Sequence, residues 1–134
     1  MQVTRVLETC LYVEDLDKAE DFYTQVLGLD CIAKVEGRHV FFRFGPGVLL
    51  LFNPEATAID NGEGIHSQSA VGAGHVAFHM RDDEIDAWRS HLQGRGVAIE
   101  LEYTWPNGGY SIYFRDPHGN SLELVTPKTW GISD

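Results

Sequence analysis

The stretch "LETCLYVEDLDKAEDFY" (residues 7–23) decides how this chain folds. Polar and apolar residues alternate as far as Val13, which predicts a strand with two different faces. Asp15 follows at the place where a helix N-cap belongs, and Gly28 supplies a stop. We therefore expect a strand at about residues 5–13 and an amphipathic helix at about 16–27. The apolar residues at helical spacing are Leu16, Ala19, Phe22, Tyr23 and Val26.

The same pattern returns in the stretch "GHVAFHMRDDEIDAW" (74–88). His75 takes the place of Glu8, and Asp82 takes the place of Asp15 as the expected N-cap. A strand at about 74–80 and a helix at about 83–93 follow from this match. An internal repeat of this kind indicates two similar modules.

The later segments match in the same order. "HVFFRFGPG" (39–47) resembles "SIYFRDPHG" (111–119), and "LLLFNP" (49–54) resembles "LELVTP" (122–127). Three strands are thus expected after each helix, near 29–36, 39–44 and 48–53, and near 97–103, 110–115 and 121–126. Each half then has the order βαβββ, and the fold class is α+β.

The repeat divides the chain into three parts within one expected domain, 1–134. Module one spans about 5–54 and module two spans about 74–127. Between them, about 55–73 is polar and rich in glycine, which predicts a mobile linker or lid.

Alternation along a strand assigns its residues to two faces. The residues expected to pack on the helices are Leu7, Leu11, Val13, Val76, Phe78 and Met80. The residues expected on the other face are Glu8, Cys10, Tyr12, His75, His79 and Glu123. That second face either meets water or curves around a cavity. Because the modules are duplicates, Glu8, His75 and Glu123 should reach related places, so three side chains able to bind a metal would converge.

Composition limits the partners. The 134 residues carry 10 Lys and Arg against 20 Asp and Glu, a formal net charge of -10. Such a surface should repel nucleic acid and anionic membranes. No apolar run is long enough to span a membrane and no signal peptide is apparent, so we expect a cytoplasmic protein. Cys10 and Cys31 lack CxxC spacing and are expected to be free thiols.

The stretches "ETCLYVEDLDKAEDFYTQVLGL", "GHVAFHM" and "SIYFRDPHGNSLEL" resemble the vicinal oxygen chelate superfamily, which includes glyoxalase I, fosfomycin-resistance proteins and extradiol dioxygenases. The resemblance runs over both modules. It implies an open curved barrel of paired modules around a cavity, with a divalent metal bound there. It also implies a homodimer, often with modules exchanged between the partners.

Carried over position by position, the resemblance makes Glu8, His75 and Glu123 the metal ligands. This set of two carboxylates and one imidazole suits Mn²⁺, Fe²⁺, Zn²⁺ or Mg²⁺. Most metal-using relatives have His or Gln where this chain has Glu8. Glyoxalase I also has a fourth protein ligand, and the aligned position in this chain is Leu50, whose side chain cannot bind a metal. Alternatives stay open: Glu8 as an exposed carboxylate that binds nothing, and His75 as a hydrogen-bonded core histidine.

Other residues of the same face are expected to line the pocket or assist the chemistry. His39 and Tyr113, aligned in the repeat, are candidates for general acid–base catalysis or for orienting substrate, or else belong to a polar cavity wall. Arg43 and Arg115 also occupy equivalent positions and are candidates either for binding a substrate carboxylate or for pairing with an acid such as Asp116. The predicted substrate-pocket residues are Cys10, Tyr12, Leu50, His79 and Ser111.

The resemblance implies a divalent-metal-dependent enzyme that acts on a small metabolite through two neighbouring oxygens. Lyase or isomerase chemistry is favoured over ring-cleaving dioxygenation. The alternative is a metal-free protein of the bleomycin-resistance type that binds and sequesters a small molecule, which the acidic surface would suit. A degenerate family member with a regulatory or immunity role is a third interpretation. Metal content distinguishes the first two, because a binder keeps its affinity after chelation.

Overall fold

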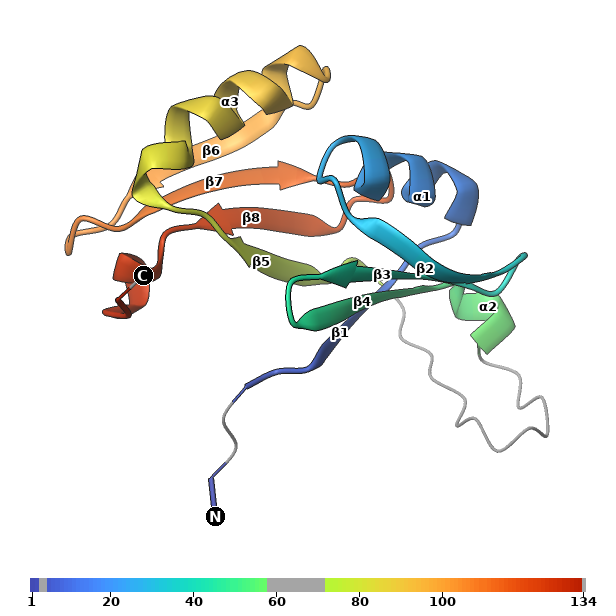
Figure 1. Cartoon of the computed structure of the whole chain (residues 1–134). Helices are drawn as coiled ribbons and strands as arrows, with labels where there is room; N and C mark the ends of the chain where they lie inside the picture. Colours follow the sequence, from blue (N-terminus) through green and yellow to red (C-terminus); the bar gives the residue numbers. More distant parts are fainter. Residues whose placement is uncertain (3–4, 58–71, 134) are drawn as a thin grey trace. The chain divides into compact units, whose positions relative to one another are not determined.

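A computed structural model describes residues 1–2, 5–57 and 72–133, and the chain divides into two compact units, Met1–Gly74 and His75–Asp134 (Figure 1). That the whole chain forms one domain stays a prediction. The first unit contains β1 (Glu8–Tyr12), α1 (Leu16–Gln25), β2 (Asp30–Val35), β3 (His39–Phe44), β4 (Gly47–Phe52) and a short helix, α2 (Pro54–Thr57). The second contains β5 (His75–His79), α3 (Ile85–Gly94), β6 (Ile99–Thr104), β7 (Tyr110–Arg115) and β8 (Ser121–Val125), with 3₁₀ turns at Asp82–Glu84 and Pro127–Trp130.

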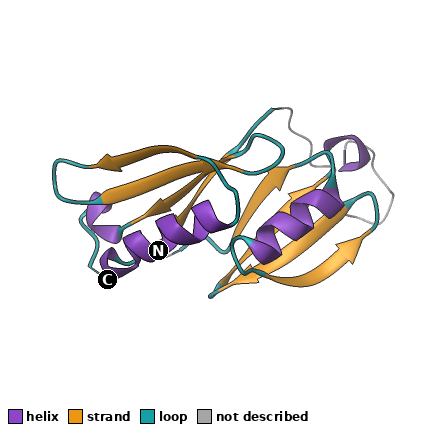
Figure 2. Ribbon diagram, turned by 90° about the horizontal axis from the view of Figure 1, so that it is seen from above, coloured by secondary structure: helices purple, strands orange, loops and turns teal. Residues whose placement is uncertain are grey.

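Both units have the βαβββ order followed by the same sheet topology (Figure 2). The strand order is β1-β4-β3-β2 in the first sheet and β5-β8-β7-β6 in the second. In each sheet the first strand pairs in parallel with the last, and the remaining pairs are antiparallel. The predicted α+β class and the duplicated module are therefore confirmed.

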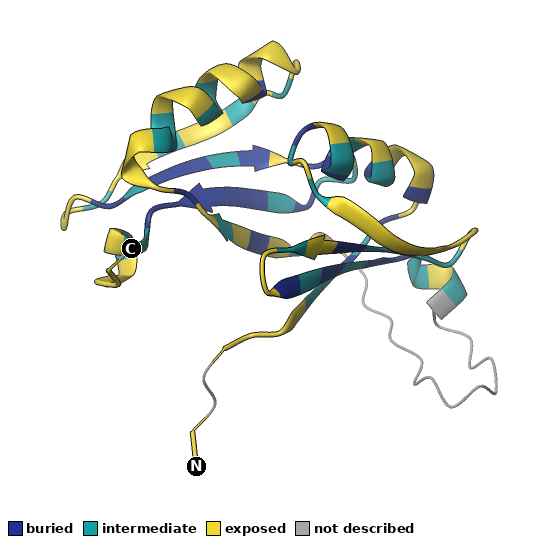
Figure 3. Ribbon diagram, in the orientation of Figure 1, coloured by how far each residue is buried: buried dark blue, intermediate teal, exposed yellow. Residues whose placement is uncertain are grey.

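The core of each unit lies between its sheet and its longer helix, as the alternation predicts. In the first unit, Leu11 and Leu49 of the sheet and Ala19 and Tyr23 of α1 are buried, and the Tyr23 ring packs on Phe42 of β3 with centroids 5.7 Å apart. In the second unit, the inner face of β7 and β8 is almost fully buried (Figure 3), and its buried residues include Ile112, Phe114, Leu122 and Leu124. Figure 3 also shows that β2 is exposed along its length.

Helix α1 begins where the sequence predicts, and α3 does not. Asp15 is the N-cap of α1, and its Oδ1 accepts a hydrogen bond from the backbone N of Lys18 at 3.0 Å. Asp82 was the expected counterpart, and this prediction is wrong: Arg81 precedes the 3₁₀ turn, and the Glu84 carboxylate accepts from its backbone N at 2.9 Å. The second module uses an extra turn to enter its helix, so the cap moves off the aligned position.

The structure differs from the sequence prediction at both ends of the first module, at Leu7 and at the start of the expected linker. Leu7 is 58% exposed, because β1 begins only at Glu8 and Leu7 precedes the sheet. The expected linker begins with α2, whereas residues 58–71, on which the prediction of a mobile linker or lid falls, lie outside the described residues. None of the helices in the described part of the chain has the length and apolar character needed to span a membrane.

The turn between β7 and β8 is locked by one buried carboxylate. Asp116 Oδ1 accepts from the backbone N of His118 at 2.8 Å and of Asn120 at 2.9 Å, and its Oδ2 accepts from the Asn120 side chain at 2.8 Å. A side chain that satisfies several turn donors fixes the turn geometry. The register that follows sets Glu123 of β8 directly opposite Tyr113 of β7.

Candidate metal centre

Glu123 lies in the middle of β8, on the face of the second sheet opposite its buried core. Ala77 of β5 and Tyr113 of β7 flank it in register. The Glu123 residue is only 8% exposed, and its Oε1 accepts a hydrogen bond from Ser111 Oγ at 2.6 Å. Tyr113 also hydrogen-bonds to the Glu123 side chain. Because a buried carboxylate is costly without donors, these two hydroxyls offset part of the cost of burying Glu123.

His75 opens β5 and lies beside Glu123. Its Nε2 is 3.3 Å from Glu123 Oε2, and its Nδ1 is 3.1 Å from both the carbonyl oxygen and the hydroxyl of Ser121. A carbonyl oxygen only accepts, so the hydrogen bond to Ser121 is donated by Nδ1, and Nε2 is the ring atom that faces Glu123. Nε2 of His75 and Oε2 of Glu123 therefore face each other, close enough for one cation to contact both.

Glu8 belongs to the other unit. It lies at the start of β1, opposite Val48 of β4, and is exposed. In the described part of the chain its carboxylate has no hydrogen-bond or ion-pair partner, and no group of three His, Cys, Asp or Glu gathers there. The structure therefore brings together His75 and Glu123, and the role of Glu8 as a third ligand stays a prediction.

The predicted pocket residues of the first unit share the Glu8 face. Cys10 pairs in register with Leu50, and Tyr12 pairs with Phe52. Burial raises the pKa of the Cys10 thiol. The hydrogen bond with Tyr12 lowers this pKa, and the nearby charge of Glu8 raises it. Cys10 is a free thiol, held mainly in its protonated form, and Leu50 offers only carbon to this face.

His39 lies in an aromatic cluster on the same face. Its ring stacks on Phe41 at 4.1 Å and meets Phe52 edge-on at 5.8 Å. Its Nδ1 is buried and has no hydrogen-bond partner among the residues that the structure describes. Burial lowers the pKa of His39, and the positive charge of Arg38 lowers it further. His39 is therefore an unprotonated imidazole at neutral pH, able to accept a proton.

Replacing His39 with phenylalanine should reduce the acid sensitivity of the fold. Because the pKa of His39 is lower in the folded than in the unfolded chain, the unfolded chain binds more protons below about pH 6.5. The free energy of unfolding of the wild type should thus decrease as the pH falls from about 6.5 through the folded pKa. Urea unfolding of both proteins at several pH values measures this. An equally steep decrease in His39→Phe would contradict the assignment.

Tyr113 and Ser111, predicted for catalysis and for the pocket, both contact Glu123. Burial raises the pKa of the Tyr113 hydroxyl, and the hydrogen bond to Glu123 and the charge of that residue raise it further. Tyr113 therefore keeps its proton at neutral pH. Ser111 is fully buried, and its hydroxyl is engaged with Glu123. His79 lies on the same face, opposite Val125 of β8, and is exposed.

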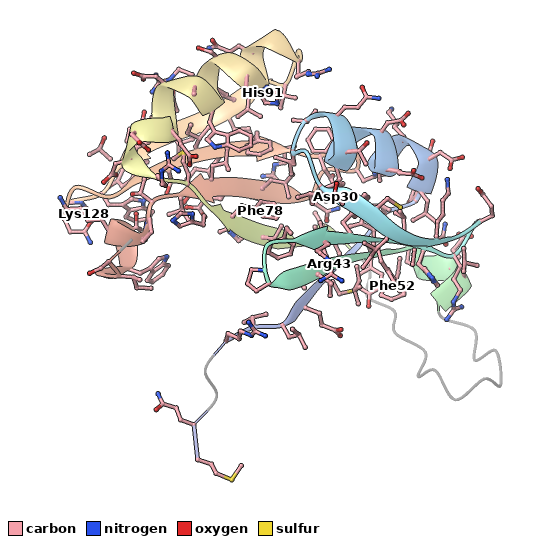
Figure 4. All side chains as sticks on the ribbon, in the orientation of Figure 1. Asp30, Arg43, Phe52, Phe78, His91 and Lys128 are labelled. Atoms are coloured by element: carbon pink, nitrogen blue, oxygen red, sulfur yellow. The ribbon has the colours of Figure 1, made fainter. Side chains whose placement is uncertain are left out.

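The two arginines of the repeat differ in their contacts. Arg115 Nε pairs with Glu100 at 3.0 Å and its Nη1 donates to the carbonyl oxygen of Gly119 at 2.9 Å, so its partner is not Asp116. Arg43 has no hydrogen-bond or ion-pair partner in the described chain, although Asp30 lies opposite it in β2. Figure 4 shows Arg43 on the side of the first sheet away from α1, and the register through Val48 places it on the Glu8 face.

The sequence interpretation missed Trp105. Its Nε1 donates a hydrogen bond to Ser111 Oγ at 2.9 Å, so it stands one step from Glu123. Trp105 begins the loop "WPNGG" (105–109), which has no equal in the short turn of the first module, and the repeat alignment therefore gave no counterpart. The available signal was an indole N–H in a turn, since a buried indole requires an acceptor.

Comparison with known proteins agrees with the fold and the repeat. The model of the Glyoxalase/Bleomycin resistance protein/Dioxygenase superfamily matches residues 5–124. A probable lactoylglutathione lyase of Vibrio cholerae is 27% identical, over 92% of this chain and 91% of its own. A metallothiol transferase FosB of Shouchella clausii is 31% identical, over 85% of this chain and 74% of its own.

A solved structure is similar over nearly the whole chain. The crystal structure of a lactoylglutathione lyase from Agrobacterium tumefaciens has a TM-score of 0.95 and 40% sequence identity, and the match covers 98% of this chain and 100% of that one. The resemblance to the vicinal oxygen chelate proteins is thus confirmed in sequence and in fold. This chain belongs to the glyoxalase/bleomycin resistance protein/dioxygenase superfamily.

Proposed function

We propose that this protein is a divalent-metal-dependent enzyme that acts on a small molecule through two neighbouring oxygens, by lyase or isomerase chemistry. The observation that carries the proposal is the pair His75 and Glu123, with Nε2 and Oε2 3.3 Å apart. The names of the relatives, lactoylglutathione lyase and metallothiol transferase, support metal-dependent chemistry that involves a thiol or its thioester.

The residues present fit a divalent metal. An imidazole and a carboxylate are a usual donor set for Zn²⁺, Fe²⁺ or Mn²⁺. Each metal-binding side chain also makes a hydrogen bond through its other polar atom: Nδ1 of His75 with Ser121, and Oε1 of Glu123 with Ser111. Metal ligands in proteins generally have such partners, which fix their orientation. We propose Glu8 as the third ligand, reaching the pair within one chain or from the second chain of a homodimer.

A metal ion held by His75, Glu123 and Glu8 would supply Lewis acidity, which would stabilise negative charge on a substrate oxygen. Leu50, on the Glu8 face, adds no donor to the set.

The remaining chemistry is assigned to side chains with opposite pKa shifts. An isomerisation moves a proton from one carbon to its neighbour, so one group takes the proton and another returns one, with no net oxidation. His39, unprotonated at neutral pH because its pKa is lowered, is the candidate acceptor, and Tyr113, which keeps its proton because its pKa is raised, is the candidate donor. Arg43, which has no partner in the described chain, suits a carboxylate of the substrate.

Metal content per chain tests the proposal. Protein purified without chelator or metal-affinity resin is exposed to Mn²⁺, Fe²⁺ and Zn²⁺, dialysed and measured by elemental mass spectrometry beside Glu8→Ala. We expect about one metal ion per wild-type chain and a loss of about tenfold or more in occupancy for Glu8→Ala, because a direct ligand should matter at least as much as its supporting residues. Asp30→Ala, a carboxylate of the same sheet, is the matched control and should keep the metal.

The outcomes separate the interpretations. An empty wild type favours the metal-free binding protein. A loaded Glu8→Ala removes that residue from the site without removing the His75–Glu123 pair. For loaded protein, the reaction of a lactoylglutathione lyase, the activity for which relatives are named, is the first to assay, with a chelator as control. Activity that survives complete metal removal would refute the proposed chemistry.

A further inference from the structure

We propose that Trp105 is a positioning residue of the metal centre, acting through Ser111 to hold the Glu123 carboxylate in its ligating orientation. This inference rests on the proposed function, since it concerns the same site. The geometry behind it is two consecutive hydrogen bonds, from the indole of Trp105 to Ser111 and from Ser111 to Glu123, whose other carboxylate oxygen lies 3.3 Å from Nε2 of His75.

These two hydrogen bonds have a fixed direction. The indole N–H of Trp105 can only donate, so Ser111 Oγ accepts from it at 2.9 Å. Ser111 then directs its single proton to Glu123 Oε1, at 2.6 Å, a length typical of a hydroxyl bound to a carboxylate. With Oε1 held by Ser111, the other oxygen, Oε2, is the one that faces Nε2 of His75 at 3.3 Å.

Burial makes these bonds effective. Ser111 is fully buried and Glu123 is 8% exposed, so water does not readily replace either partner. A hydrogen bond in such surroundings is electrostatically stronger than in water, and losing one member leaves a polar group without a partner. Ser111 without its indole donor would be free to turn its hydroxyl elsewhere, for instance toward Tyr113, which it also contacts.

The position of the indole is set by its own loop. The backbone N of Trp105 donates to the carbonyl oxygen of Gly109 at 2.8 Å, and the backbone N of Gly108 donates to the carbonyl oxygen of Trp105 at 2.8 Å. The ring also meets Tyr103 edge-on, with centroids 4.8 Å apart. The Asn107 side chain ties the loop to the carbonyl oxygen of Lys128 at 2.8 Å. Contacts within its own loop thus fix the position of Trp105 independently of its hydrogen bond to Ser111.

A double-mutant cycle tests this relay, by which we mean the hydrogen bonds from Trp105 through Ser111 to Glu123. Mn²⁺ and Zn²⁺ affinities are measured by calorimetry for the wild type, Trp105→Phe, Ser111→Ala and the double variant. We expect roughly tenfold weaker binding for Trp105→Phe and 10- to 100-fold weaker binding for Ser111→Ala. Because Trp105 acts through Ser111, the double variant should bind no more weakly than Ser111→Ala alone. Trp130→Phe, at a residue that is 76% exposed, is the matched control and should bind as the wild type does.

A structural role alone would give a different result. If Trp105 only stabilised its loop, Trp105→Phe would lower the unfolding temperature and leave the metal affinity unchanged, or its effect would add to that of Ser111→Ala; either result overturns the relay. If Trp105→Phe does not fold, Ser111→Ala and Ser111→Thr decide: the relay requires Thr to retain metal affinity and Ala to lose it. If the wild type binds metal and these variants bind it equally well, the relay is refuted and the proposed function is not. A wild type that binds no metal refutes the proposed function and the relay together.

Discussion

Replacing Glu123 with glutamine is expected to abolish tight metal binding and to leave the fold intact. The amide has the shape of the carboxylate, and its oxygen can still accept the hydrogen bond that Ser111 Oγ donates at 2.6 Å, so little is lost in packing. The amide is neutral, however, and a poor ligand beside His75. We expect affinity for Mn²⁺ or Zn²⁺ to fall by more than about 100-fold, beyond the loss that follows removal of a supporting residue. Calorimetric titration and a thermal melt measure the two effects.

His75→Ala should lose the metal as well, since it removes the other donor of the pair. Glu100→Gln is the control for charge, because it neutralises a carboxylate of the same unit that pairs with Arg115 at the surface. It should bind metal as the wild type does. Unchanged metal stoichiometry in both Glu123→Gln and His75→Ala would refute the assignment of these two residues as metal ligands.

Gly109→Ala should strongly destabilise the second unit. Gly109 is buried, and a Cβ at this residue would lie 2.5 Å from both the backbone N and the Cα of Thr129 in the C-terminal 3₁₀ turn. No rotamer relieves a contact with backbone, so the loop or the turn must move. Overpacking costs about 1–3 kcal/mol, and a backbone contact should reach the upper end of that range. The unfolding temperature should fall by roughly 10 °C, as measured by circular dichroism.

Gly94→Ala is the matched control for this change. Gly94 is the last residue of α3, and a Cβ there would meet nothing within 4 Å. Alanine in a helix is favoured over glycine by about 0.5–1 kcal/mol, so this variant should be at least as stable as the wild type. Equal stability of Gly109→Ala and the wild type would show that the loop and the 3₁₀ turn separate at little cost.

Several features of the fold could be predicted because they are local. Apolar residues at every second position assign Leu11 and Val13 to the core and Glu8 to the opposite face, and the structure confirms each of these. The N-cap at Asp15 follows from a carboxylate placed before a helical pattern. The aligned Asp82 fails as a cap because the second module enters its helix through an additional turn, which a repeat alignment does not encode.

The sequence by itself determined the duplicated βαβββ order and the face on which His75 and Glu123 lie, because periods of two and 3.6 residues are written in neighbouring positions. Only the tertiary structure decided that these two side chains meet at 3.3 Å, since that distance depends on the parallel pairing and register of β5 and β8. It also decided that Trp105 supports Ser111. Contacts between strands far apart in the chain are set by packing across the sheet, which no local pattern specifies.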